Sequence, residues 1–118
     1  MRNVKGIVEY SIKTYKTATG KRPFRKWLDD LSDHQARAAI DLRIDRMKMG
    51  NFGKCEPLKG NLYELKIDIG PGYRVYFSKI GLQIILLLCA GSKKTQQKDI
   101  DKAREYLDDY KKNEGQAD

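Results

Sequence analysis

Charged side chains alternate with apolar ones along residues 62–78, a stretch that a Gly-Pro-Gly segment at 70–72 divides in two. Successive side chains of a strand point to opposite faces, so the alternation predicts two strands, each with an apolar and a polar face. The short glycine-rich break between them is typical of an antiparallel hairpin. The polar face carries the charged residues Glu64, Lys66, Asp68 and Arg74.

Arg74 is the first candidate for chemistry on this face. A guanidinium presents its donors in a planar fork that fits two phosphate oxygens at once, so Arg74 is suited to bind a phosphate group. The same fork fits a carboxylate, so Arg74 could instead form an ion pair with Glu64 or Asp68 across the hairpin. The spacing of the residues favours phosphate binding and the ion pair equally. Phosphate binding and an ion pair across the hairpin are therefore both open.

Two other residues offer groups that could take up a proton. Lys66 lies on the polar face, and crowding by Arg74 and Lys93 would lower its pKa enough for the amine to act as a base. A solvated surface lysine is the alternative for Lys66. Glu64 would serve either as a base or as a counter-charge.

If the phosphate group that Arg74 would bind belongs to RNA, the residue types exclude some ways of cleaving it. Cleavage without metal needs a base for the 2′-OH, a cation for the phosphorane and an acid for the 5′ oxygen. The chain has one histidine, His34, near the start of a predicted helix, so a histidine pair is excluded and His34 is expected on the surface. No carboxylate and histidine cluster suits a two-metal site, so we expect no metal and no cofactor. Catalysis would fall to lysine, arginine, tyrosine or carboxylate groups.

Composition indicates one basic domain. The 118 residues are 40% hydrophobic, enough for a single core over residues 1–118. The net charge is +8; residues 1–98 carry 20 basic and 9 acidic side chains, whereas residues 99–118 carry 4 and 7. Such a charge favours a polyanionic partner. Two cysteines without metal-ligand spacing, a charged start and no long apolar run predict a cytoplasmic protein without a membrane segment.

Apolar periodicity predicts the elements that position the polar face. Residues 7–14 alternate as a strand, for which we expect an edge position in the sheet. Residues 83–90 are apolar on both faces, as in a central strand. Apolar residues recur at helical spacing from Pro23 to residue 31, which predicts a first helix with Trp27 in the core. The same spacing follows Ser32 and continues to residue 49, which predicts a second helix. Ser32 and Gln35 match a capping box for this second helix.

A third helix is predicted after the sheet. Thr95 would cap it, its inward face would carry Ile100, Ala103, Leu107 and Tyr110, and residues 113–118 would fray. The predicted fold class is therefore α+β, in the order βααβββα. It has an antiparallel sheet of about four strands, two N-terminal helices and a C-terminal helix.

Four segments in this order and spacing resemble the RelE/ParE superfamily of bacterial toxins, most of all its HigB-like addiction module killer branch. They are GNFG at 50–53, LYELKI at 62–67, GPGYRVYF at 70–77 and GSKKTQQKDI at 91–100. The resemblance implies a small microbial RNase fold. It also implies a type II toxin that cuts mRNA on the ribosome without metal, and a HigA-like DNA-binding antitoxin as its partner.

The resemblance also implies roles for single residues. Arg74 matches an active-site arginine, Lys66 a family lysine, and Lys93 lies near a family arginine. Glu64 stands where RelE proteins commonly have a second lysine, and Asp99 where they have a tyrosine, so the general acid is unassigned. Lys54 and Lys59, before the hairpin, are expected to contact ribosomal RNA. Tyr76, Lys94 and Gln97 are candidates for base stacking, phosphate contact or leaving-group contact, with packing in the sheet as the alternative for Tyr76.

Two other functions stay open. ParE-like members of the superfamily inhibit DNA gyrase on the same fold, and a basic module that binds nucleic acid without catalysis would fit the composition. The ELKI and GYR residues on one face favour the nuclease. Translation in vitro with the purified protein, followed by mapping of message ends, would separate the three.

Overall fold

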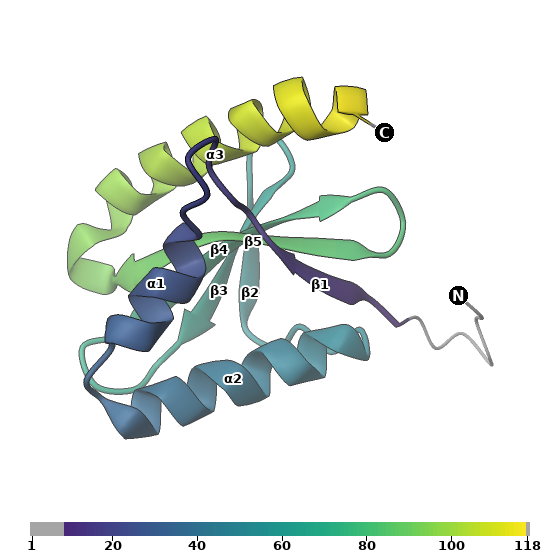
Figure 1. Ribbon diagram of the computed structural model, residues 1–118. Coiled ribbons are helices and arrows are strands. Elements are labelled where there is room, and N and C mark those ends of the chain that lie inside the picture. The colour runs from purple at the N-terminus through teal and green to yellow at the C-terminus, as the bar shows by residue number, and fades with distance from the viewer. Residues whose placement is uncertain (1–8, 118) are drawn as a thin grey trace.

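The structure of the protein is a computed structural model that describes residues 9–117. Three helices and five strands follow one another along the chain (Figure 1). In chain order they are β1 (Ser11–Thr14), α1 (Pro23–Asp30), α2 (His34–Lys48), β2 (Cys55–Leu58), β3 (Leu62–Ile67), β4 (Tyr73–Ile80), β5 (Ile84–Ser92), a 3₁₀ turn (Lys93–Thr95) and α3 (Gln96–Ala117).

The five strands form one sheet in the order β1-β5-β4-β3-β2. The predicted hairpin is confirmed, because β3 and β4 pair antiparallel with Lys66 opposite Arg74. The edge position of the first strand is confirmed too, although Ile7 and Val8 lie outside the described residues. The prediction of a purely antiparallel sheet is wrong at this edge, since β1 pairs parallel to β5 from Ser11 to Thr14. A parallel pair needs a long crossover, and everything between these two strands supplies it.

Strand β2 is the element that the sequence analysis missed, so the order is βααββββα. It contains Pro57, which cannot donate to a strand ladder and argues against a central strand. β2 lies at the free edge of the sheet, where such a residue is tolerated, and pairs only with β3. Lys54 and Lys59 therefore flank an edge strand instead of lying on one loop.

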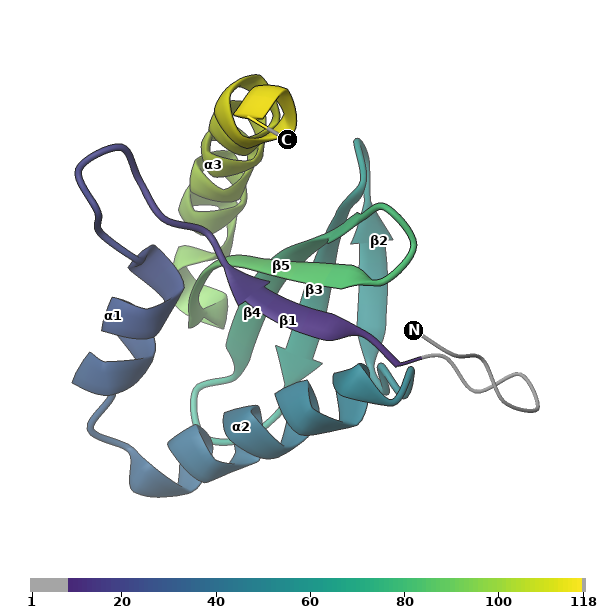
Figure 2. The same ribbon diagram turned by 45° about the vertical axis from the view of Figure 1, so that its right-hand side comes forward.

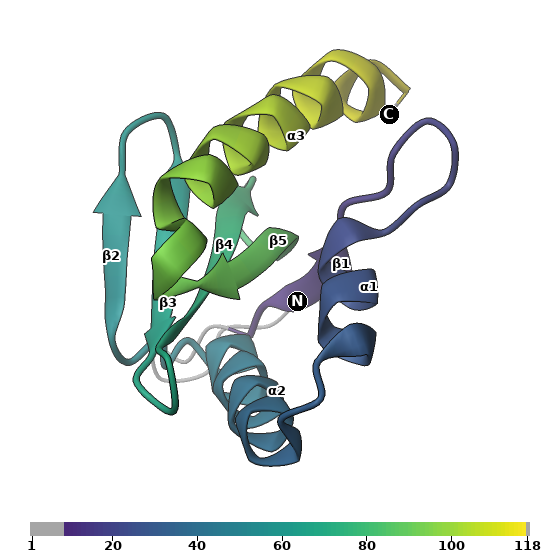
Figure 3. The ribbon, with the colours of Figure 1, turned by 90° about the vertical axis from the view of Figure 1, so that its left-hand side faces the viewer.

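Helices cover both faces of the sheet. Helices α1 and α2 pack on one face, and α3 crosses the other (Figures 1 and 3). The polar hairpin face therefore lies partly beneath α3. The inward face predicted for α3 is confirmed by Ala103, Leu107 and Tyr110, which are buried.

The helix starts follow local chemistry. Helix α1 begins at Pro23, whose fixed φ suits the first turn. The capping box at Ser32 is not formed, because Asp33 caps α2 by accepting the backbone N–H of Ala36 at 3.0 Å. At α3 the Thr95 hydroxyl donates to Asp99 at 2.6 Å. Helix α3 continues to Ala117, so it includes most of the segment expected to fray.

Two aromatic residues tie α1 and the strand before it to the rest of the molecule. Trp27, expected in the core, is only half-buried and packs edge-on against Tyr73 at 5.8 Å between ring centroids. Tyr15 donates to Asp109 at 2.5 Å, so the segment after β1 is held against the second half of α3 (Figure 2). Cys89 is buried. Among residues 9–117 no helix is both long and apolar enough to cross a membrane.

Candidate active site

Arg74 lies at the middle of the charged cluster, buried between β3, β5 and the start of α3. Only 6% of it is exposed, and its neighbours in the sheet are Lys66 on one side and Gly91 on the other. Its Nη1 donates to the Tyr73 carbonyl at 3.1 Å and lies 3.7 Å from Asp68. Its buried Nε has no hydrogen-bond partner among residues 9–117. The ion pair with Asp68 thus exists, but it leaves part of the guanidinium fork open.

Lys93 and Arg74 converge at the hairpin turn. A Cβ built on Gly72 would lie 3.6 Å from Lys93 Cβ and 3.7 Å from Arg74 Nη1. The backbone N–H of Lys93 also donates to the Gly72 carbonyl at 2.7 Å. Gly72 has φ +82°, a conformation that favours glycine, so this turn lets the two cations approach each other. Lys93 itself is exposed and forms no ion pair within the described residues.

The predicted lowering of the Lys66 pKa is wrong. Lys66 Nζ lies 2.6 Å from the Glu56 carboxylate on the neighbouring strand β2. This hydrogen bond raises the pKa of Lys66 above its ordinary value, and the repulsion from Arg74 is too small to reverse the shift. The sequence analysis overlooked Glu56 because it did not include β2. Lys66 is therefore held as a cation and is poorly suited to act as a base.

Glu64 is a buried carboxylate with fixed orientation. Only 2% of it is exposed, and its Oε2 accepts from the Tyr76 hydroxyl at 3.1 Å and from Gln96 Nε2 at 2.6 Å. Its Oε1 accepts none of the hydrogen bonds found within residues 9–117. One carboxylate oxygen is thus anchored, and the other is available to a ligand or a proton.

Tyr76 packs in the sheet and cannot stack on a base. It is fully buried, and desolvation together with the nearby Glu64 raises the pKa of Tyr76 well above its ordinary value. The tyrosine therefore stays neutral and serves as a donor that orients Glu64. The packing alternative considered from the sequence is the correct one for this residue.

Gln96 is the site residue that the sequence did not reveal. It is the first residue of α3, and it reaches Glu64 across the sheet face, whereas the predicted Gln97 is exposed and donates to Asp101 at 3.0 Å. Two adjacent glutamines at a helix start point in different directions, and the sequence alone did not identify which one faces the sheet. The only signal was the placement of this helix directly after β5.

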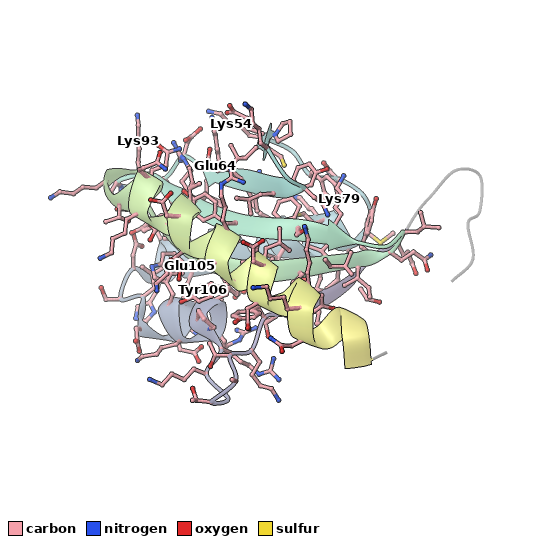
Figure 4. All side chains as sticks on the ribbon, turned by 90° about the horizontal axis from the view of Figure 1, so that it is seen from above. Lys54, Glu64, Lys79, Lys93, Glu105 and Tyr106 are labelled. Carbon is pink, nitrogen blue, oxygen red and sulfur yellow. The ribbon has the colours of Figure 1, made fainter. Side chains whose placement is uncertain are left out.

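The remaining predicted residues lie at the surface, and the structure does not bring all of them to the site. Figure 4 shows Lys93, Glu64 and Lys54 along one side of α3, with Glu105 and Tyr106 on the other side. Lys54 is exposed and paired with Asp68, which in turn contacts Arg74. Lys94 is exposed next to Lys93, whereas Lys59 is exposed at the other end of β3 from Lys66 and Arg74. Within the described part of the chain, no group of three His, Cys, Asp or Glu residues could hold a metal ion.

The fold and the site define a small α+β domain in which a buried arginine with an open donor and a buried carboxylate lie beside exposed lysines. This arrangement suits the binding of a phosphate group. Residues 26–108 match the family described as "Phage derived protein Gp49-like (DUF891)". The chain therefore belongs to the Gp49-like family, which is part of the RelE/HigB-like toxin superfamily.

The chain is also similar to a protein of Haemophilus influenzae. It is 43% identical over 81 residues, which cover 69% of this chain and 82% of the relative, and it is described as "Uncharacterized protein". The match to the Gp49-like family confirms the superfamily expected from the sequence. Its HigB-like branch stays a prediction.

Proposed function

We propose that this protein is the HigB-like toxin of a type II toxin–antitoxin system and that it cleaves mRNA bound to the ribosome without a metal ion. The observation that carries the proposal is Arg74, a buried arginine whose Nε lacks a partner among residues 9–117. A buried donor without an acceptor costs roughly 1–3 kcal/mol, and a phosphate oxygen would remove that cost. Membership of the Gp49-like family, which includes toxins, supports the same function.

Four side chains supply the base, the cations and the acid that the reaction needs. The 2′ oxygen attacks phosphorus, its proton passes to Glu64 Oε1, and the bond from phosphorus to the 5′ oxygen breaks to leave a 2′,3′-cyclic phosphate. Arg74 and Lys66, both cations, stabilise the charge that develops on the phosphorane. Lys93 supplies a proton to the departing 5′ oxygen, since its ammonium is exposed and has no ion pair in the described chain.

The ribosome is needed for geometry in this proposal. Cleavage requires the 2′ oxygen, phosphorus and 5′ oxygen in line, and the protein has no histidine pair to compensate for a poorly aligned message. The exposed Lys54, Lys59 and Lys94 would contact ribosomal RNA. The proposed partner that blocks the toxin is a HigA-like antitoxin.

Translation in vitro tests the proposal directly. One message is incubated with the purified protein, free and in a translating complex, with and without a chelator, and its ends are mapped. We expect cuts only in the translating complex and no effect of the chelator where the ribosomes remain intact. Binding should weaken with salt, with a log–log slope of roughly −0.7 to −0.9 per phosphate contact.

One arginine variant tests the site in this assay, and a second serves as its control. Arg74→Ala should abolish the cuts, whereas Arg37→Ala, on α2 and away from the site, should not. Growth arrest without any new message ends, or equal cutting of free RNA, would contradict the proposed activity.

A further inference from the structure

A groove of about 310 Å³ lies on the other side of the first turn of α3 from Glu64, between α1 and the end of β5. Its volume is at the lower end of the range for small-ligand sites. Two of its lining residues adjoin the site described above, because the Tyr73 carbonyl accepts from Arg74 and Gly91 pairs with Arg74 in the sheet. The lining that matters here comprises Trp27, Leu31, Tyr73, Gly91, Lys98 and Asp99.

The walls of this groove are aromatic. Trp27 is half-buried, so part of its indole faces the groove, and Tyr73 holds the ring edge-on at 5.8 Å and 67°. An indole that is fixed on one side and open on the other is a surface on which a planar base stacks. Trp27 is also the only tryptophan of the 118-residue chain.

Asp99 gives the groove an oriented acceptor. A Cβ on residue 91 would overlap the Asp99 carboxylate and lie 2.9 Å from Thr95 Oγ1, so Gly91 makes room for this carboxylate against the sheet. Its Oδ2 accepts from the Thr95 hydroxyl at 2.6 Å, which fixes the group. Oδ1 accepts none of the hydrogen bonds found in residues 9–117. A carboxylate placed in this way accepts from an amino group and repels a carbonyl.

The charge around the groove favours a nucleotide over an apolar side chain. Lys98 lines it, and Lys93 and Lys94 are exposed one helical turn earlier. Strand β1 pairs with β5 only as far as Leu87. Within the described chain, the backbone edge of β5 after Leu87 therefore has no neighbouring strand on that side and faces the groove. The groove thus combines a stacking surface, a fixed anion and a cationic rim.

We infer that this groove binds one base of the substrate RNA and prefers a base with an exocyclic amino group, such as cytosine or adenine, over uracil. The inference rests on the proposed function, because it places this base beside the phosphate held by Arg74. Trp27 stacks on the base, Asp99 accepts from the amino group, and Lys98 neutralises the attached phosphate.

Fluorescence of the single tryptophan reports binding without any cleavage. The full chain is titrated with CMP and with UMP, two pyrimidine nucleotides that differ at the ring position bearing an amino group or a carbonyl. N-acetyltryptophanamide, titrated in parallel, corrects for light absorption and collisional quenching. We expect saturable quenching by CMP and AMP and at least about tenfold weaker binding of UMP, the size expected for a hydrogen bond to a charged group.

Variants on α3 identify the acceptor. Asp99→Asn should weaken CMP binding about tenfold and reduce the discrimination against UMP. Asp101→Asn, an exposed aspartate two residues further along the helix, should leave both titrations unchanged. In the ribosomal assay, Asp99→Asn should shift the base preference beside the cut, whereas Asp101→Asn should not.

Several outcomes would overturn the inference. They are a lack of saturable quenching by any nucleotide, equal affinity for CMP and UMP, and an equal response to ribose 5-phosphate. Quenching only by N-acetylphenylalaninamide would assign the groove to a peptide side chain instead. Message cleavage without nucleotide quenching removes this inference alone, and quenching without message cleavage removes the proposed nuclease while the groove stands as a nucleotide site.

Discussion

Arg74 and Arg43 differ in how many of their guanidinium donors have a hydrogen-bond acceptor. Arg43 donates to three backbone carbonyls, those of Lys66 at 2.7 Å, Lys54 at 3.1 Å and Phe52 at 3.2 Å. Arg74 is more deeply buried, and yet its buried Nε has no hydrogen-bond partner among residues 9–117. A side chain that the native state satisfies is retained for stability, whereas one that it leaves unsatisfied needs another reason.

Substitution with methionine separates the two cases. Arg74→Met replaces a costly buried charge by an apolar chain of similar length, so we expect a free energy of unfolding within about 1 kcal/mol of the parent, or above it. Message cleavage should fall at least about 100-fold, as on loss of one oxyanion donor. Urea denaturation and the translation assay measure the two effects.

The matched variant is Arg43→Met. It removes the arginine donor from three carbonyls, of which that of Lys54 keeps the backbone N–H of Lys66 at 3.0 Å. We expect a loss of about 1–3 kcal/mol of stability. If Arg74→Met destabilised the protein as much as Arg43→Met, the arginine would be structural, and the catalytic assignment would fail.

Glu64 offers a second test at the residue scale. Glu64→Gln keeps an oxygen that can accept from Tyr76 and Gln96, so the fold should be retained, whereas the base is lost. We expect message cleavage to fall by a factor of about 10²–10⁴. Glu105→Gln, on the other side of α3, serves as the control. Full cleavage by the folded Glu64→Gln protein would show that another group takes the proton.

Helix α1 presents two aromatic side chains with different surroundings. Phe24 is fully buried, whereas Trp27 is half-exposed beside the groove. We expect Phe24→Ala to cost about 3–5 kcal/mol and Trp27→Ala to cost less, since fewer contacts are lost. Denaturant unfolding followed by circular dichroism compares them. Equal losses would place Trp27 in the core, as its helical spacing first predicted.

The junction of β5 and α3 depends on Gly91. An alanine there would collide with Asp99 and Thr95 and displace the first turn of α3, at a cost of about 1–3 kcal/mol. Removing the Asp99 side chain opens the space again. The Gly91→Ala and Asp99→Ala double variant should therefore be more stable than the sum of the two single changes implies. Additive losses, measured by urea denaturation, would show that the two residues do not meet.

Some of these elements could be predicted from sequence patterns, and others could not. Strands β3, β4 and β5 were predictable because their side chains alternate or are wholly apolar, and the residue positions of the polar face followed from that period. The burial of Glu64 and Arg74 was not predictable, because it depends on where α3 crosses the sheet. Strand β2 was hidden by Pro57, and with it Glu56, which determines the charge of Lys66. Gln96 became part of the site only through this tertiary placement.

At the scale of the whole molecule, buried acidic groups, among them Cys89, Tyr15 and Tyr76, should make the free energy of unfolding decrease at alkaline pH. Burial raises the pKa of Cys89 from 9.0 to about 12 and raises the pKa values of Tyr15 and Tyr76 above 10.0. The folded state thus keeps protons that the unfolded chain releases. Stability is complete below pH 9, falls first through Cys89 and falls more steeply above pH 10, at about 1.4 kcal/mol per pH unit for each group.

Urea denaturation under reducing conditions between pH 8 and pH 11 measures this profile. Tyr76→Phe should reduce the slope above pH 10 and leave the slope between pH 9 and pH 10 unchanged. Cys89→Ala should reduce the slope from pH 9 upward. A profile that stays flat to pH 11 would contradict the burial of these groups.

The parallel pairing of β1 with β5 also bears on the order in which the protein forms during its synthesis. The first strand to leave the ribosome finds its neighbour only after β5 has emerged, and the bond from Tyr15 to Asp109 joins residues 94 positions apart. Contacts between such distant segments form late. The nascent chain therefore holds an incomplete sheet, without α3 over Glu64, until nearly all of it has been made. Under the proposed function, the ribosome that synthesises the toxin would not meet a complete active site during translation.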